Sequence, residues 1–159
     1  MATPTTSAPE ALPPLLRDRF GYLLGISHGG LRAIAQRRLA GELGLEVKQY
    51  GVMTVLAGLE EPPSQQALAE LIRIDRTTMV MMCDALEAAG YVERRRNPRD
   101  RREQLLHLTP AGERARKRAD RIVTAAEKEF LSPLSAGEAT ELRRLLQAVA
   151  AHRGRGPGA

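Results

Sequence analysis

The sequence predicts a mainly α-helical protein with one small β hairpin. Ala, Leu and Arg dominate its 159 residues, a composition that favours helices, while aromatic side chains account for only 3%. Apolar residues recur with helical spacing along most of the chain. Two stretches, 91–96 and 103–109, instead alternate as short strands around a turn that contains Pro98. The length suits one domain with an aliphatic core.

The charge balance predicts a polyanionic partner. The formal net charge is +5, and only three of the 24 basic residues are lysines. Arginine presents a planar fork of donors that suits phosphates and guanine edges, so nucleic acid is expected before a membrane. No apolar run reaches the roughly 18 residues that span a bilayer, and the N-terminus does not resemble a signal peptide. We therefore expect a cytoplasmic protein without membrane contact.

The chain divides into a central domain and two polar ends. Residues 1–12 are small, polar and Pro-containing, and we expect them to be disordered; residues 153–159 form an expected frayed tail. Residues 13–152 should form a single domain. Its first helix is expected over 13–40, with an interruption or strain near Gly29-Gly30.

Capping residues and helix breakers indicate where the later helices begin and end. Ser135, with Glu138 three residues on, is typical of a capping box. The expected helices and their signals are 46–59 before Pro62-Pro63, 65–71 after Ser64, 76–89 between Asp75 and Gly90, 110–130 after Thr109 with Pro110, and a last helix after Ser135 to about 151.

The order of these elements predicts a winged helix-turn-helix. Two short helices joined by a tight turn place the second helix in a major groove of DNA, and the hairpin after it forms the wing. Six arginines fall between residues 94 and 102, where a duplex backbone would lie. The alternative is a solvated surface hairpin without a partner.

The expected recognition helix has an apolar and a polar face. On a helical wheel, Met79, Met82, Cys83 and Leu86 share one side, which should face the core. Threonine hydroxyls can bond phosphates or base edges, and a threonine methyl can contact thymine. The residues expected to face DNA are Arg76, Thr77, Thr78 and Met81.

The stretch "DRTTMVMMCDALEAAGYVERRRNPRDRREQLLHLTPAG", residues 75–112, resembles the MarR family of dimeric bacterial transcription regulators. The family's wing motif, aspartate-x-arginine followed by an apolar strand that ends Leu-Thr, matches Asp100, Arg102, Leu106, Leu108 and Thr109. The preceding Leu-Glu-x-x-Gly and Val-x-Arg match Leu86, Glu87, Gly90, Val92 and Arg94. The likeness is specific over this core, and helix order extends it more weakly from about residue 15 to residue 151.

The resemblance implies a homodimer held by helices 13–40 and 110–151, with a winged helix-turn-helix core at 46–109 in each subunit. Such proteins bind double-stranded DNA at near-palindromic operators and usually repress genes. Small aromatic or phenolic acids, drugs or oxidants commonly relieve that repression. Many relatives carry an arginine where Met81 stands, which shifts the expected base and backbone contacts towards the wing.

The wing therefore holds most of the candidate DNA contacts. Arg102 matches the family's wing arginine and is the foremost candidate for a minor-groove or phosphate contact. Asp100 is expected to pair with its neighbours and to fix the shape of the loop. Arg94, low on the first strand, suits either packing or phosphate contact. The wing candidates are Arg94, Arg96, Arg99, Asp100, Arg101 and Arg102.

An effector pocket is expected between the dimer helices and the winged core, because domain boundaries are common ligand sites. His28 and Arg32 on the first helix and Tyr50 on the second would offer a cation or hydrogen bonds to an aromatic acid.

Other functions are weighed against this interpretation. The fold could serve as an architectural or protein-interaction module, or as an oxidant sensor through Cys83, although a cysteine on an apolar face is more often an inert core thiol. The three histidines are widely separated, so no metal site or cofactor is expected. No nucleophile–base pair or phosphate-binding loop predicts an enzyme.

Overall fold

The computed structural model describes residues 15–16 and 18–153. The expectations for residues 1–12 and 154–159 lie outside the described residues, and Arg153 is the last residue of a helix. The elements in chain order are α1 (Phe20–Leu43), α2 (Val47–Gly58), α3 (Gln65–Ile72), α4 (Arg76–Ala88), β1 (Val92–Arg96), β2 (Gln104–Leu108), α5 (Pro110–Phe130) and α6 (Ala136–Arg153). The predicted class, mainly α with one hairpin, is confirmed.

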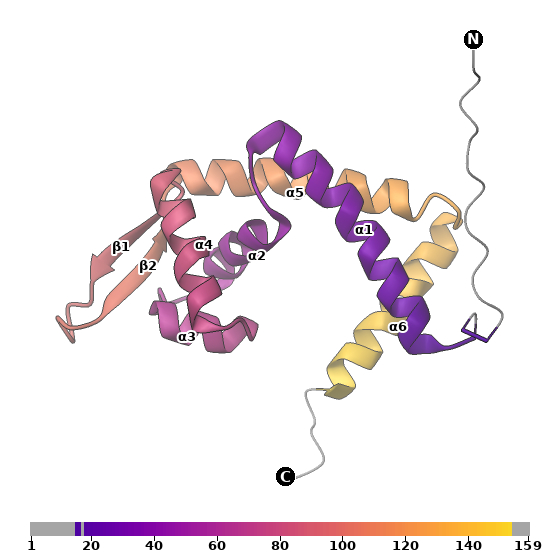
Figure 1. The fold of residues 1–159 in the computed structure, drawn as a ribbon, viewed down its shortest axis with the longest axis horizontal. Helices are drawn as coiled ribbons and strands as arrows, with labels where there is room; N and C mark the ends of the chain where they lie inside the picture. The colour runs from indigo at the N-terminus through magenta and orange to yellow at the C-terminus, as the bar shows by residue number, and fades with distance from the viewer. Residues whose placement is uncertain (1–14, 17, 154–159) are drawn as a thin grey trace.

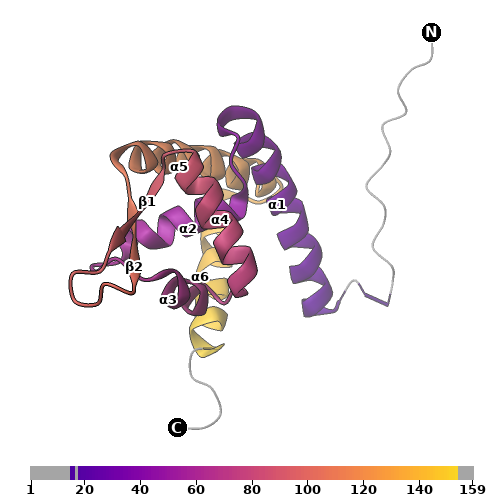
Figure 2. The ribbon, with the colours of Figure 1, turned by 60° about the vertical axis from the view of Figure 1, so that its left-hand side comes forward.

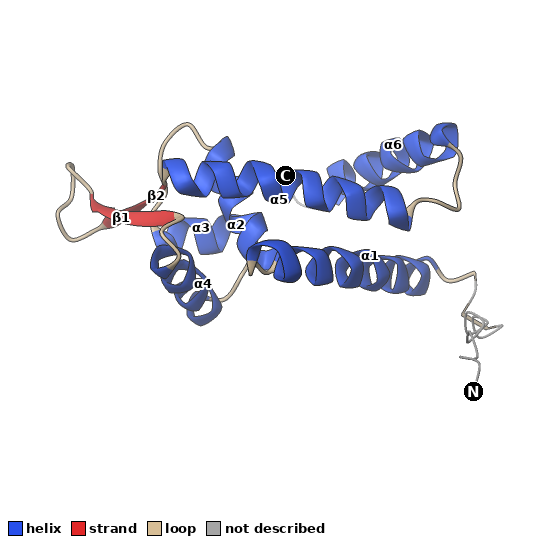
Figure 3. Ribbon diagram, turned by 90° about the horizontal axis from the view of Figure 1, so that it is seen from above, coloured by secondary structure: helices blue, strands red, loops and turns tan. Residues whose placement is uncertain are grey.

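The long helix α5 organises the molecule (Figure 1). The hairpin lies at one end of α5 and α6 at the other, while α2, α3 and α4 cluster beside the hairpin. Seen from above, α1 lies alongside α5 (Figure 3), and these two helices make extensive contact. Among the helices of the described residues, none is long and apolar enough to cross a membrane.

Helix α1 differs from its prediction at both ends and in its middle. Leu15 and Leu16 lie in a turn, and the helix begins at Phe20. The predicted interruption near Gly29-Gly30 is wrong, because α1 continues without a break to Leu43. Gly30 serves packing instead: a β-carbon there would lie 3.2 Å from Cε2 of Phe130, so the missing side chain lets α5 approach α1 closely.

The predicted helix caps are confirmed. The side-chain oxygens of Ser64, Asp75 and Thr109 each accept a hydrogen bond from the backbone N–H three residues later, at 3.2, 2.9 and 2.9 Å. At the start of α6, the Glu138 carboxylate accepts from the Ser135 N–H at 2.8 Å, and the Ser135 hydroxyl accepts from the Glu138 N–H at 3.3 Å. These bonds satisfy N–H groups that the first turn of a helix leaves free.

An aliphatic and sulfur-containing core lies between the end of α1, α2, α3, α4, the hairpin and α5. No polar or charged residue is buried in the described part of the chain. Because the aromatic content is low, methionine and leucine fill the volume. The largest fully buried side chains are Leu39, Met53, Leu68, Met79, Leu86, Leu106, Val52, Val92 and Cys83.

The hairpin is attached to the helix-turn-helix by backbone hydrogen bonds. β1 and β2 pair antiparallel, with Arg94 opposite Leu106. The loop before α3 pairs with β2 on the side away from β1. The Leu106 N–H donates to the carbonyl of Pro63 at 2.9 Å, and Ser64 forms an isolated antiparallel β-bridge with Leu105. The wing is therefore anchored to the start of α3 as well as to the end of α4.

Helix α6 has an apolar face that no other part of the described chain covers. From Ala136 to His152, every residue except Ala139 is exposed. The helix follows the end of α5 that lies opposite the hairpin (Figure 1), and in Figure 2 its C-terminal part projects below α3. Its exposed apolar side chains are Leu142, Leu145, Leu146 and Val149, and the first half of α1 adds Phe20, Leu24 and Ile26.

The junction between the wing and α5 depends on a close backbone approach. A β-carbon at Gly112 would lie 2.0 Å from the carbonyl oxygen of Tyr91 and 2.9 Å from Cδ1 of Leu108. We therefore expect Gly112→Ala to lower the free energy of unfolding by about 3 kcal/mol or more, since a backbone carbonyl cannot move aside as a flexible side chain can. Urea unfolding at fixed protein concentration measures this loss.

Gly41→Ala is the matched control. A β-carbon at Gly41 meets nothing within 4 Å, and the residue lies inside α1. Alanine there should raise stability by about 0.5–1 kcal/mol. Equal effects at both positions would contradict the packing argument.

Candidate nucleic-acid interface

Helix α4 presents a polar face opposite the core. Met79, Met82, Cys83 and Leu86 are buried, as the helical wheel predicts. On the other side Arg76 and Thr77 are exposed and Thr78 is partly buried. Met81 is 68% exposed, the largest apolar exposure on this helix. These side chains can meet another molecule without disturbing the core.

A turn with an unusual backbone sets the angle between α3 and α4. Arg73 has φ 54°, the only positive φ of a residue other than glycine in the described residues. This left-handed conformation costs a residue with a β-carbon roughly 1 kcal/mol. The Ile74 N–H then donates to the carbonyl of Ala69 at 3.0 Å, which closes the end of α3. The sequence predicted a tight turn here, but not its conformation.

The tip of the wing is shaped by side chains that bind backbone N–H groups. The Asn97 amide oxygen accepts from the Arg99 N–H at 2.9 Å, and its amide nitrogen donates to the Glu103 carboxylate at 2.6 Å. The Asp100 carboxylate accepts from the Arg102 N–H at 3.0 Å. Asp100 thus shapes the loop through a backbone bond, whereas the sequence suggested pairing with arginine heads. The contribution of Glu103 was not foreseen.

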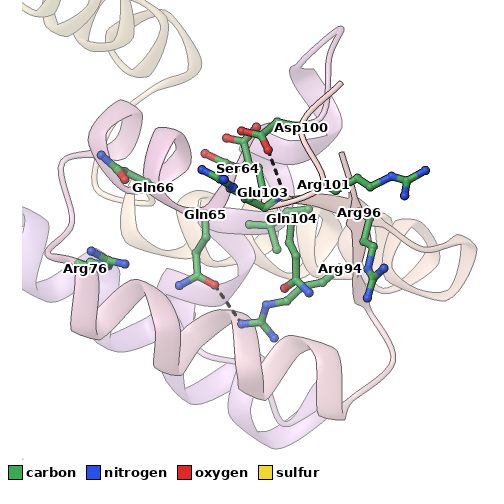
Figure 4. A pocket seen from close by; sticks show the side chains of 12 residues that line it. Ser64, Gln65, Gln66, Arg76, Arg94, Arg96, Asp100, Arg101, Glu103 and Gln104 are labelled. Atoms are coloured by element: carbon green, nitrogen blue, oxygen red, sulfur yellow. Dashed lines mark hydrogen bonds between the residues drawn. The ribbon is translucent and has the colours of Figure 1, made fainter. Parts of the chain in front are cut away.

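A basic groove lies between the helix-turn-helix and the wing (Figure 4). This wing groove is open and has a volume of about 680 Å³. Five arginines and two acidic residues line it, which makes it attractive to an anion. Its lining residues are Ser64, Gln65, Gln66, Arg76, Arg94, Arg96, Asp100, Arg101, Arg102, Glu103, Gln104 and Leu106.

Arg94 differs from the other wing arginines. Its guanidinium donates to the carboxylates of Glu87 and of Asp84, the latter at 2.5 Å, and to the amide oxygen of Gln65 at 3.0 Å. The side chain is only 18% exposed. Figure 4 shows Gln65 and Arg94 pointing toward each other across the wing groove. Glu87 and Arg94 belong to the spacing that indicated the family resemblance, but their pairing was not predicted.

The remaining arginine candidates are available to a ligand. Arg96, Arg99, Arg101 and Arg102 are all exposed, and none has a carboxylate within 4.0 Å in the described part of the chain. Arg95, by contrast, pairs with Glu93 on its own strand. Positively charged heads without internal partners favour contact with phosphate.

The predicted effector residues occupy two different environments. His28 and Arg32 are exposed on α1. Tyr50 is partly buried, and its hydroxyl donates to the Asp120 carboxylate on α5 at 2.7 Å. Burial, and then this bond, raise the pKa of Tyr50. The wing groove includes none of the three residues. Within the described residues, no three His, Cys, Asp or Glu side chains gather as a metal site would require.

Comparisons of the sequence connect this geometry to known regulators. The family model described as "MarR family" matches residues 43–103. A protein of Thauera aromatica, described as a transcriptional regulatory protein for the hcr operon, is 36% identical over 98 residues, which are 62% of this chain and 58% of that protein. The HTH-type transcriptional regulator BilQ of Clostridium symbiosum is 33% identical over 67% of this chain and 75% of its own length. The match therefore spans less than two thirds of the first of these relatives.

Solved structures agree with the sequence relatives. A transcriptional regulator of the MarR family from Rhodococcus sp. RHA1 superposes with a TM-score of 0.76 at 28% identity, covering 87% of this chain and 96% of that one. CouR from Rhodococcus jostii RHA1, solved bound to p-coumaroyl-CoA, has a TM-score of 0.72 at 28% identity and covers 92% and 99%. The winged helix-turn-helix fold and its flanking helices are thus shared along nearly the whole length of these structures.

The environment of Cys83 predicts an unreactive thiol. The side chain is fully buried, its sulfur lies 3.6 Å from that of Met79, and burial raises the pKa of the thiol to about 11. Because the folded-state pKa lies above that of a free cysteine, the thiol stays neutral below about pH 10. An aromatic disulfide reagent at pH 8 should label Cys83 slowly in the native protein and at least about a hundredfold faster in urea. Rapid native labelling would restore the oxidant-sensor hypothesis.

Proposed function

This chain belongs to the MarR family of transcription regulators, and on that premise we propose that it binds a specific double-stranded DNA operator and represses transcription until a small ligand releases it. The observation that supports DNA binding most directly is the pairing of two surfaces. The polar face of α4 lies beside a groove and a wing tip that carry exposed arginines. A helix of this kind fits the major groove, and a wing reaches the flanking backbone.

We assign separate roles to the two surfaces. Thr77 and Thr78, near the start of α4, would contact base edges or phosphates, and Arg76 would bind phosphate. Met81, exposed further along the same face, would contact a thymine methyl rather than read guanine. The wing residues proposed to contact phosphates or the minor groove are Arg96, Arg99, Arg101 and Arg102, with Asp100 holding their loop.

The proposed functional unit is a homodimer. The apolar faces of α6 and of the first half of α1 lie open to solvent in a single subunit, and small soluble domains seldom leave surfaces of this kind uncovered. A second copy would cover both faces and relate two α4 helices by a two-fold axis. The operator would then be a near-palindrome with half-sites about 34 Å apart, one turn of the double helix.

The proposed effector is a small aromatic or phenolic acid, or a conjugate of one. CouR, of the same fold, was solved with p-coumaroyl-CoA bound. In this chain Tyr50 and Asp120 join α2 to α5 through a hydrogen bond that a phenol or carboxylic acid could compete for. His28 and Arg32, exposed on α1, would supply charge or hydrogen bonds to the carboxylate end.

Selection of bound sequences from a random DNA pool tests the proposed function. A regulator should enrich a near-palindrome and bind it at least about a thousandfold tighter than competitor DNA. An architectural module would show little preference. A reporter gene placed behind the selected site tests repression and should be silenced by the protein.

Aromatic acids should release the protein from this site. Tyr50→Phe should abolish that release, because Tyr50 is proposed to bind the ligand.

Arg102→Ala should weaken operator binding by about 1–3 kcal/mol and, if its contact is to phosphate, flatten the dependence of log K on log salt by about one. The loss should be similar across operator variants, and the melting temperature should change little because the side chain is exposed. Fluorescence anisotropy at several salt concentrations measures both quantities. Arg121→Ala, which removes the same charge from an exposed position on α5, is the control and should bind nearly as wild type.

Leu145→Glu should convert the dimer to monomers and abolish specific DNA binding together, because it places a charge in the proposed apolar interface. Leu145 is 47% exposed in a single subunit, so the isolated fold tolerates the change. Sedimentation velocity and anisotropy on the same samples provide the readout. Gln147→Glu adds a charge of the same sign on the opposite face of α6 and should stay dimeric; a dimeric Leu145→Glu variant would contradict this interface.

A further inference from the structure

Arg94 joins three structural elements at the base of the wing. It lies in the middle of β1, whereas its partners are Gln65 at the first turn of α3 and Asp84 and Glu87 on α4. The Glu87 carboxylate also accepts from the backbone N–H of Arg94 at 3.2 Å, so it holds the residue at two points. A planar guanidinium bound in this way resists rotation more than a single flexible ion pair does.

The position of this cluster matters because the wing is a lever. A two-stranded hairpin has little stability of its own. Besides the backbone contacts of β2 with Pro63 and Ser64, its orientation relative to α4 depends on side chains near its base. A strand of five residues is about 17 Å long, so a tilt of roughly 10° at the base would move the tip by about 3 Å. That displacement is enough to take Arg99, Arg101 and Arg102 away from a phosphate.

We propose that Arg94 is a positioning residue that fixes the orientation of the wing against α4, and that Glu87 and Asp84 support DNA binding through Arg94 without touching DNA. The inference rests on the proposed function. It explains how the polar face of α4 and the wing tip keep the relative position that binding to one duplex requires. It also separates Arg94 from the arginines proposed to contact DNA, whose heads have no carboxylate partner in the described residues; these are Arg96, Arg99, Arg101 and Arg102.

Neutralising Asp84 or Glu87 tests this proposal, because a positioning role and a purely electrostatic role predict opposite changes in DNA affinity. Asp84 and Glu87 lie on the helix that would enter the major groove. If they act only through their charge, neutralising either one removes repulsion from phosphates and strengthens binding. If they hold Arg94 in place, neutralising either one weakens binding.

Glu87→Gln and Glu93→Gln form a matched pair for this measurement. Each removes one negative charge from an arginine pair on or beside β1, but Glu93 pairs only with Arg95 of its own strand. Glu87→Gln should weaken operator binding about tenfold, and Glu93→Gln should leave it unchanged or tighter. Arg94→Gln should cost about tenfold with the salt slope unchanged. The double variant Glu87→Gln/Arg94→Gln should be no weaker than Arg94→Gln alone, because both changes break the same contact.

Wing orientation can be measured without DNA, which separates this proposal from the proposed function. Spin labels on Ala88→Cys and Arg99→Cys report the distance from the end of α4 to the wing tip, while buried Cys83 stays unlabelled. The distance distribution should be narrow in the parent and broaden on Glu87→Gln, but not on Glu93→Gln. If Glu87→Gln lowers the folded fraction, Asp84→Asn, at the more exposed carboxylate, replaces it.

Three results would overturn the positioning role. They are an unchanged distance distribution in the folded Glu87→Gln and Asp84→Asn variants, an Arg94→Gln variant whose salt slope falls by about one, or tighter operator binding by the folded Glu87→Gln variant. The second result would make Arg94 a direct phosphate contact. A parent protein that shows no sequence preference for DNA would refute the proposed function, while the distance measurement would still decide the structural role of Arg94.

Discussion

The arrangement of the whole molecule depends on the contact between the start of α5 and the start of the wing. The Thr109 hydroxyl donates to the carbonyl of Gly90 at 2.7 Å and accepts from the Gly112 N–H, while the Thr109 N–H donates to the Tyr91 carbonyl at 3.0 Å. Because Gly112 has no side chain, that carbonyl can pack against the first turn of α5. The end of α4, both strands and α5 therefore meet at one point, and the direction of α5 is set relative to the wing.

Arginines that look equivalent in the sequence have different surroundings in the structure. Arg94 is bound to α3 and α4, and Arg95 to a neighbour on its own strand, whereas Arg99, Arg101 and Arg102 lie in the loop that joins β1 to β2. The reason is geometric: a strand alternates its side chains between two faces, and only one face of β1 meets α4. Arginine heads without a carboxylate partner in the described residues are thus concentrated towards the tip, where Asn97 and Asp100 shape the backbone.

The two ends of α5 carry surfaces of different character, and a second subunit would connect their roles. At one end the basic wing favours a polyanion, and at the other the described part of the chain leaves the apolar face of α6 uncovered. Burying that face against a copy of itself would contribute the free energy of association and would also set the separation of two α4 helices. In the proposed dimer, apolar burial at the α6 end of α5 therefore determines the half-site spacing that the α4 helices at the other end can recognise.

The sequence by itself determined the features that depend on neighbours a few residues apart. Caps at Ser64, Asp75 and Thr109, the buried face of α4 and the charged hairpin were all predicted, since each rests on local hydrogen bonds or on periodicity. Only the tertiary structure decided that α1 continues through Gly29-Gly30, because the partner of Gly30 is Phe130, a hundred residues along the chain. The same distinction holds for the candidate site. Its arginines were predicted from the sequence, but the contacts that hold Arg94 were not, because Gln65, Asp84 and Glu87 come together around it only in the folded chain.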